Sequence, residues 1–223
     1  MALSVVESNN MGNKDLQLIE ENIPLHNDCA TNLQSTGDSS TLKHPLENTW
    51  TLWYLENDRT KSWEELQNEI TSFDTVEDFW SLCNHIKSAS EIKIGSDYSL
   101  FKKGIRPMWE DNANKKGGRW VITLERKQHK ILDNIWLDVL LSLIGEAFDN
   151  STEICGAVLN VRSKFDKISV WTANGKNEEG IMEIGRKLKE NLHLDSYGII
   201  IQYELHKDTM VKSGAGIKSI YSI

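Results

Sequence analysis

Residues 154–172 read ICGAVLNVRSKFDKISVWT and predict a β-hairpin. Two strand-like runs, Ile154–Arg162 and Lys167–Thr172, flank a polar turn at Ser163–Asp166. Successive side chains of a strand point to opposite faces, so Ile168 and Val170 share one face of the second run. The other face carries Lys167, Ser169 and Trp171. We expect helices to pack on the aliphatic face and Trp171 to remain on the polar one.

The rest of the chain alternates between runs with the period of a strand and runs with the period of a helix. A helix is expected to begin after Thr75, because Thr75 to Asp78 resembles a capping box. The other expected elements are strands at Thr49–Leu55, Trp120–Glu125 and Tyr197–His206, a helix at Asp133–Phe148, and a helix carrying Ile181, Ile184, Leu188 and Leu192. Three helices scattered among hairpin-linked strands indicate an α+β fold, with helices on one face of an antiparallel sheet.

Composition and charge restrict the classes of function. The formal net charge of −8 argues against general affinity for a nucleic-acid backbone, which requires many Lys and Arg contacts. The cysteines Cys29, Cys83 and Cys155 have no CxxC spacing, so neither a disulfide framework nor a metal site is expected. No apolar run approaches the roughly 18 residues of a membrane span. We expect a soluble cytoplasmic protein without membrane partners, with the nucleus as a further location.

The chain is expected to consist of a tail and one domain. Residues 1–43 are polar and contain no aromatic residue, so they cannot bury enough apolar surface to offset the entropy of ordering. We predict that residues 1–43 are disordered and that residues 44–223 form the folded domain.

Eight tryptophans, none before Trp50, point to a ligand site. Trp109 lies in a proline-broken loop and is followed by Glu110, while Trp63 lies in another polar stretch. Two loop indoles are able to clamp a flat ring, and a carboxylate accepts hydrogen bonds from an edge such as the N1–H and N2 amine of guanine. The alternative is that each indole caps the core beside solvated charges. A positively charged ring gains further cation–π attraction, and basic residues near Arg162 suit phosphates. Together these features favour 7-methylguanosine triphosphate, the end of a eukaryotic mRNA.

Several motifs resemble the eukaryotic translation initiation factor 4E family of mRNA cap-binding proteins. The motifs, in order along the chain, are His44-Pro45-Leu46, Thr75-Val76-Glu77-Asp78-Phe79-Trp80, Asp97-Tyr98-Ser99-Leu100-Phe101, Met108-Trp109-Glu110-Asp111, Gly117-Gly118-Arg119-Trp120 and Ile144-Gly145-Glu146. The resemblance runs from about His44 to the C-terminus. It implies a curved antiparallel sheet with three helices on the convex face and the cap pocket on the concave side. It also implies a role in starting translation, without catalysis, metal or cofactor.

The resemblance assigns cap-binding roles to individual residues. Trp63 and Trp109 resemble the two stacking indoles, and Glu110 resembles the carboxylate that binds guanine. Trp171 resembles the indole at the N7-methyl group. The Met108–Trp109 backbone is matched to guanine O6. Phosphate contacts are assigned to Arg162 and Lys167, with lesser contributions from Arg119 and Lys164.

The predicted helix at Asp133–Phe148 carries more apolar surface than a core requires. Ile135, Trp136, Val139, Leu140, Leu143, Ile144 and Ala147 cover one broad side. Leu137, Leu141 and Phe148 widen this arc to about 240°, against roughly 100° for an ordinary core-facing stripe. A deeply buried helix is one explanation and a partner site is the other. The resemblance implies a site for a helix with a tyrosine-to-leucine motif, as in the scaffold initiation factor 4G and the inhibitory 4E-binding proteins. This partner site would comprise His44, Pro45, Val76, Trp80, Leu137, Asp138 and Leu141.

The chain departs from the family pattern at two positions. Ala215 follows Lys212-Ser213-Gly214 where a serine that can be phosphorylated is common. Asp138 stands where the family usually has a longer Glu, which predicts weaker binding of 4G-type partners.

Three alternatives remain open from the sequence. An enzyme acting on caps or nucleotides would require a nucleophile with a base or a metal cluster, and neither GxSxG nor a P-loop is present. A cap-binding isoform that represses translation would share the pocket but bind the scaffold weakly. A methyl-lysine reader would leave Arg162 and Lys167 without a role.

Overall fold

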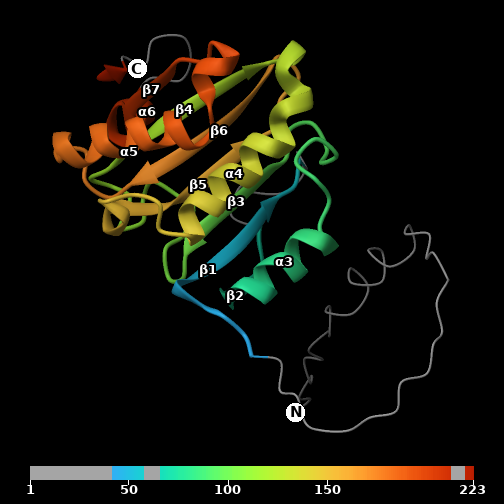
Figure 1. The fold of residues 1–223 in the computed structure, drawn as a ribbon. Helices are drawn as coiled ribbons and strands as arrows, with labels where there is room; N and C mark the ends of the chain where they lie inside the picture. The colour runs from blue at the N-terminus through green and yellow to red at the C-terminus, as the bar shows by residue number, and fades with distance from the viewer. Residues whose placement is uncertain (1–41, 58–65, 212–218) are drawn as a thin grey trace, which may run out of the picture. The chain divides into compact units, whose positions relative to one another are not determined.

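The computed structural model describes residues 42–57, 66–211 and 219–223 (Figure 1). These residues form an eight-stranded sheet of order β2-β1-β3-β5-β6-β4-β7-β8, with every neighbouring pair antiparallel. The strands are β1 (Pro45–Leu55), β2 (Gln67–Thr75), β3 (Asp97–Lys102), β4 (Gly118–Glu125), β5 (Ile154–Asn160), β6 (Phe165–Thr172), β7 (Ile201–Leu205) and β8 (Tyr221–Ser222). The expected antiparallel sheet is confirmed.

Three helices cover one face of the curved sheet (Figure 1). They are α3 (Val76–His85), α4 (Leu132–Ile144) and α5 (Glu178–Asn191). The chain also contains a short α6 (His206–Val211) and the 3-10 segments η1 (Arg126–Ile131), η2 (Ser151–Glu153) and η3 (Leu194–Tyr197). In the part of the chain that is described, no helix has the length and apolar character needed to cross a membrane.

The predicted alternation along β6 sets the position of the core. Ile168 and Val170 are fully buried and pack with the helices, as expected. Opposite Val170 on β4 lies Trp120, whose indole Nε1 donates to the Ile181 carbonyl of α5 at 2.9 Å. Gly185 of α5 permits this approach, since a Cβ there would lie 2.4 Å from the Trp120 ring. The backbone of α5 therefore contacts the Trp120 ring of β4 directly.

The helix boundaries partly match the sequence analysis. The Thr75 hydroxyl accepts the Asp78 N–H at 3.2 Å, which confirms the cap that begins α3. The predicted helix at Asp133–Phe148 is wrong at its end, because α4 stops at Ile144. Gly145 closes the helix and Glu146 has a left-handed φ of 50°. Ala147 is consequently exposed and Phe148 enters the core from outside the helix, so neither widens its apolar face.

Other differences concern elements with weak sequence signals. The predicted strand Tyr197–His206 is wrong at both ends, because Gly198 turns at a φ of 64° after η3 and His206 begins α6. Sequence analysis missed β2, an edge strand whose only buried residue is Phe73. The hairpin turn is confirmed, although β5 ends at Asn160 and β6 begins at Phe165.

The predicted tail and cysteine chemistry are only partly covered by the structure. Residues 1–41, and Cys29 with them, lie outside the described residues, so disorder there stays a prediction. Lys43, which we placed in the tail, forms an ion pair with Asp78 at 2.7 Å. Cys83 and Cys155 are free thiols. Among the described residues, no group of three or more His, Cys, Asp or Glu side chains is placed to hold a metal ion.

We predict that Gly185→Ala destabilises the protein by up to about 2 kcal/mol in urea or thermal unfolding. Alanine gains about 1 kcal/mol of helix propensity, but the added methyl group overpacks the Trp120 ring at a cost of roughly 1–3 kcal/mol. Arg186→Ala, at the exposed neighbouring position, is the control and should change stability by less than about 0.5 kcal/mol. A stabilised Gly185→Ala variant would contradict the proposed contact.

Candidate functional site

A pocket of about 240 Å³ opens on the sheet face opposite the helices. Its lining comprises Trp53, Leu55, Gln67, Asp97, Ser99, Pro107, Met108, Trp109, Glu110, Arg119, Val158, Asn160 and Trp171. Alternation of side chains along β1 explains why this strand contributes to the pocket. Trp50 and Leu52 point into the core with the helices, so Trp53 and Leu55 face the pocket. The structure thus brings the predicted residues Met108, Trp109, Glu110, Arg119 and Trp171 together. Trp63 lies outside the described residues.

The loop between β3 and β4 presents Trp109 and Glu110 to solvent. The Trp109 side chain is 39% exposed, and Glu110 is exposed beside it. A buried amide organises the loop from inside, because Asn114 Nδ2 donates to the carbonyls of Arg106 at 2.9 Å and Met108 at 2.8 Å. Asp111 accepts the backbone N–H groups of Arg106 and Ala113. An indole is therefore held partly free on a loop fixed by hydrogen bonds.

Trp171 forms the floor of the pocket. It is only 5% exposed, although it lies on the face of β6 that carries Lys167. Its ring packs against Phe101 at 5.5 Å, edge to face, and against His206 at 4.2 Å. Cys155 belongs to the same small cluster, and burial raises the pKa of its thiol to about 12. The face of the sheet opposite the helices thus has an aromatic cluster of its own.

His206 is a buried neutral base under this floor. Burial is the main cause that lowers the pKa of His206 to about 3, and the positive charge of Arg119 lowers it further. Arg119 in turn donates to the Glu204 carboxylate at 3.1 Å. The arginine predicted to assist phosphate binding is therefore already paired with an acid.

Arg162 is likewise held by protein groups. Its guanidinium Nη1 lies 2.5 Å from the carboxylate of Asp97 and also donates to the carbonyls of Ser96 and Val161. Asp97 lines the pocket, which places Arg162 at its rim rather than in its lining. Lys167 is paired in register with Asn160, another lining residue, and Lys164 lies exposed in the turn. The predicted basic residues therefore border the pocket at its hairpin end.

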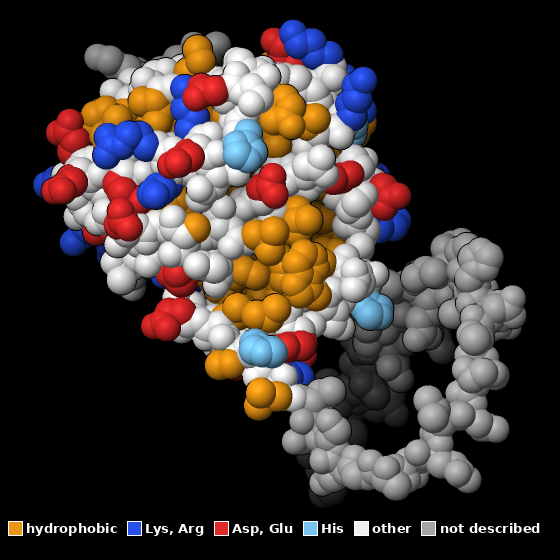
Figure 2. Space-filling model, in the orientation of Figure 1, with side chains coloured by type: hydrophobic (Ala, Val, Ile, Leu, Met, Phe, Trp, Pro, Cys, Tyr) orange, Lys and Arg blue, Asp and Glu red, His pale blue; other side chains and the backbone are white. Residues whose placement is uncertain are grey.

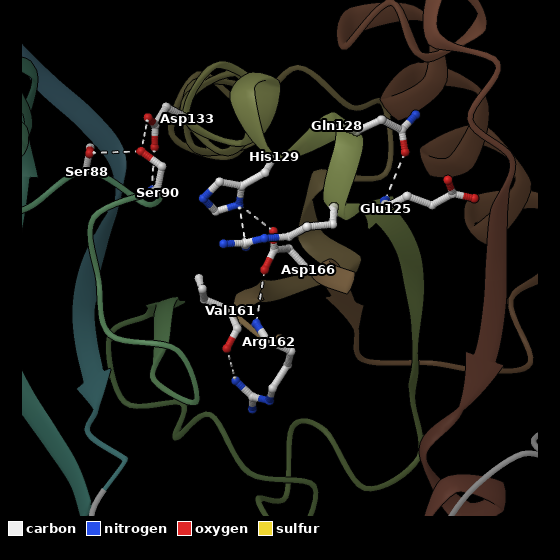
Figure 3. Close-up of polar contacts among 10 residues, drawn as sticks. Ser88, Ser90, Glu125, Gln128, His129, Asp133, Val161, Arg162 and Asp166 are labelled. Atoms are coloured by element: carbon white, nitrogen blue, oxygen red, sulfur yellow. Dashed lines mark hydrogen bonds and ion pairs between the residues drawn. The ribbon is translucent and has the colours of Figure 1, made fainter. Parts of the chain in front are cut away.

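The fully buried carboxylate of Asp166 fixes this hairpin turn (Figure 3). It accepts the Arg162 backbone N–H at 3.0 Å and contacts His129 Nδ1 of η1 at 2.7 Å. Arg126 of η1 also approaches the His129 ring, at 3.3 Å. Sequence analysis placed Asp166 in a polar turn and assigned it no role, because its partner His129 is distant in sequence. Trp53, Gln67, Asp97 and Asn160 were also missed, although alternation along β1 is a signal for Trp53.

The predicted partner residues lie on the helical face of the sheet. The His44 carbonyl accepts the Val76 N–H at 2.9 Å, which joins the start of β1, and with it Pro45, to α3. Trp80 of α3 is 41% exposed and Leu141 of α4 is 36% exposed. Figure 2 shows a continuous hydrophobic patch on the face that carries α3 and α4. Leu137 is half-buried against the core and Asp138 is half-buried beside it. The surplus apolar surface predicted for α4 is therefore partly exposed.

Comparisons with known proteins agree on one family. A family profile described as Eukaryotic initiation factor 4E matches residues 45–220. Eukaryotic translation initiation factor 4E1 of Drosophila melanogaster is 66% identical over 199 residues, which cover 87% of this chain and 76% of the relative. A crystal structure of Ascaris suum eIF4E-3 with the m2,2,7G cap has a TM-score of 0.76 at 47% identity, covering 82% of this chain and 99% of that chain. The complex of C. elegans eIF4E-3 with the 4E-binding protein Mextli and a cap analog has a TM-score of 0.75 at 45% identity, covering 82% and 100%.

We predict that His206 makes the protein less stable in acid. Its folded pKa of about 3 lies below the ordinary value of 6.5, so the unfolded chain binds a proton that the folded chain does not. Stability is then lost as pH falls from about 6.5 toward 3, with roughly 2 kcal/mol lost between pH 7 and pH 5.

His206→Phe keeps an aromatic ring on Trp171 but cannot titrate. Urea unfolding of both proteins at pH 7 and pH 5 isolates the histidine, because the other titrating groups are shared. Equal losses of stability in the two proteins would show that His206 is not the group concerned.

Proposed function

The chain belongs to the eukaryotic initiation factor 4E family, and we propose that it binds the 7-methylguanosine cap of mRNA and recruits a scaffold protein to start translation. The observation that carries this proposal is the pocket, in which one fixed loop places an exposed indole and a carboxylate side by side above the Trp171 floor.

Trp109 and Glu110 bind the guanine ring in this proposal. The exposed Trp109 indole stacks on the ring, which contributes about 1–3 kcal/mol, and the positive charge of the methylated ring adds roughly 0.5–2 kcal/mol. The Glu110 carboxylate accepts the N1–H and N2 amine as charge-assisted hydrogen bonds. The Met108–Trp109 backbone approaches guanine O6, and Trp171 contacts the methyl group. The resemblance assigns the second stacking plane to Trp63, which lies outside the described residues.

The hairpin end of the pocket binds the phosphates. Asp97 and the carbonyls of Ser96 and Val161 orient the Arg162 guanidinium through Nη1 and one N–H of Nη2. A guanidinium carries five N–H groups, so among the described residues the Nε–H and the second N–H of Nη2 stay available for phosphate. Lys167 adds a point charge from the strand that also carries Trp171, with Lys164 in the turn and Arg119 near the floor as lesser contributors. The acids beside both arginines limit their attraction for anions in general, so that affinity depends on the ring as well as on the triphosphate.

The patch on α3 and α4 recruits the protein partner. Its exposed Trp80 and Leu141 offer apolar anchors for the apolar face of an amphipathic helix. We infer that this helix is the tyrosine-to-leucine motif of 4G-type scaffolds and 4E-binding proteins, and that His44, Pro45, Val76, Leu137 and Asp138 complete the site. Because the patch and the pocket lie on opposite faces of the sheet, cap and partner are able to bind at once. This exposed apolar surface argues against the alternative, an isoform that binds the scaffold weakly.

Binding alone accounts for this function, and no bond is made or broken in it. We therefore propose a translation factor without catalytic activity that acts in the cytoplasm. Incubation with capped RNA and magnesium should release no nucleotide.

Titration with 7-methylguanosine triphosphate and with unmethylated GTP, followed by tryptophan fluorescence, tests the function. We expect strong quenching by the methylated nucleotide and roughly two- to thirtyfold weaker binding of GTP, since only the former carries the ring charge that strengthens stacking. Equal affinities for the two nucleotides would overturn the proposal.

Two exposed indoles on opposite faces provide a matched pair of variants. Trp109→Ala should weaken binding of 7-methylguanosine triphosphate by about 1–3 kcal/mol, because stacking is lost, and Trp109→Phe should restore part of it. Trp80→Ala, at a side chain of similar exposure, should leave nucleotide affinity within about twofold.

Trp80→Ala should instead weaken binding of a peptide that carries the tyrosine-to-leucine motif, by about 2 kcal/mol or more if Trp80 is a central anchor. Isothermal titration calorimetry of both variants with nucleotide and with peptide measures the two effects. If Trp80→Ala reduced both affinities alike, Trp80 would support the fold rather than the partner.

A further inference from the structure

A second recess, of about 590 Å³, adjoins the proposed cap pocket and is basic. Its rim carries the side chains of Lys115, Lys116, Lys176 and Lys207, all of them exposed. The lysines come from three separate segments, namely the end of the β3–β4 loop, the β6–α5 loop and the start of α6. None of the described aromatic side chains lines this recess.

Backbone hydrogen bonds join the three segments into one frame. The Gly175 N–H donates to the Lys116 carbonyl at 2.9 Å, and the His206 N–H donates to the Gly117 carbonyl at 3.2 Å. Gly117 packs so closely that a Cβ would lie 1.7 Å from the Thr172 carbonyl oxygen. The four lysines are therefore brought to one rim by a fixed backbone rather than by chance overlap of flexible loops.

The charge of this recess is not neutralised within the described part of the chain. None of the four ammonium groups has a carboxylate within salt-bridge distance there, and Lys115 Nζ contacts only the neutral Asn112 amide oxygen, at 2.7 Å. Glu204, on the neighbouring strand β7, is engaged by Arg119. The chain as a whole is negative, with 33 acidic and 25 basic residues, so the four lysines make this recess a positively charged site on an acidic protein.

The recess lies at the end of the strands that carry the pocket, and Leu205 of β7, which packs against the helical core, also lines it. Arg119 and Trp171 line the pocket, whereas Gly117 and Ala173 line the recess. Each pair is two residues apart along its segment, about 7 Å, and side chains two apart in a strand share a face. The phosphates proposed at Lys167 lie six residues before Ala173, about 20 Å at roughly 3.3 Å per residue, so RNA several nucleotides long is able to span the distance to the recess.

We propose that this recess binds the phosphodiester backbone of the RNA that follows the cap. Lysines bind phosphate as point charges, and a site without aromatic or amide readers has little means to distinguish bases. The contact is therefore independent of RNA sequence and dependent on salt. This inference rests on the proposed function. The four unneutralised lysines, within reach of RNA that leaves the pocket, favour RNA over an acidic peptide as the occupant.

The test compares wild type, the double variant Lys176→Gln/Lys207→Gln and the control Lys87→Gln. Lys87 is an exposed lysine that follows α3, on the helical side of the sheet. Affinities are measured by fluorescence for 7-methylguanosine triphosphate, for a capped RNA of twelve nucleotides and for the same RNA without a cap, across a range of salt concentrations.

We expect the double variant to bind capped RNA roughly two- to tenfold more weakly at low salt, with unchanged affinity for the mononucleotide. The salt dependence of log K should become shallower by about 0.7 for each phosphate that the variant no longer neutralises. The control should match wild type with all three ligands.

Unchanged affinity for capped RNA in the double variant would overturn the inference, and so would an equal loss for RNA and mononucleotide. Tighter binding of RNA would also overturn it, because the recess would then be occupied by an acidic segment of protein. If wild type failed to bind the methylated mononucleotide, the proposed cap function would fall. The uncapped RNA would still test the recess, where the double variant must again bind more weakly.

Discussion

Alternation of side chains in β4 and β6 is the constraint on which the rest of the structure depends. Trp120 and Val170 face each other across the register and enter the helical core, while their neighbours Arg119 and Trp171 enter the pocket. A slip of one residue in this pairing would exchange the two sets of side chains. Core packing therefore determines which side chains the pocket receives, and the close contact of α5 with Trp120 secures the register from outside the sheet.

The charges around the pocket are arranged in pairs rather than as a uniform basic surface. Asp97 holds Arg162, Glu204 holds Arg119, and the buried Asp166 fixes the turn between the two strands of the hairpin. Such pairs orient the guanidinium groups before a ligand arrives, which reduces the entropy lost on binding. The pairs also limit the attraction of this acidic protein for anions to the sites around the pocket, on one face of the sheet.

Sequence analysis predicted much of this arrangement. The elements and contacts that it missed have identifiable physical causes. The hairpin at residues 154–172, the cap at Thr75 and the apolar surplus of α4 all carry strong local patterns. The edge strand β2 has no such pattern, since solvent replaces packing on most of its side chains. Arg162 pairs with Asp97 and Asp166 contacts His129, both distant along the chain, so only the folded structure shows which of these groups meet. The role assigned to Trp63 and the disorder expected of the N-terminal tail remain predictions.

The cluster beneath the pocket has a consequence for redox chemistry. Oxidants attack the thiolate form of cysteine, and a thiol with a pKa of about 12 is almost entirely protonated in neutral solution. Cys155 also lies under the Trp171 ring, where reagents have little access. Conditions that oxidise exposed thiols elsewhere in a cell would therefore leave the floor of the ligand site chemically unchanged.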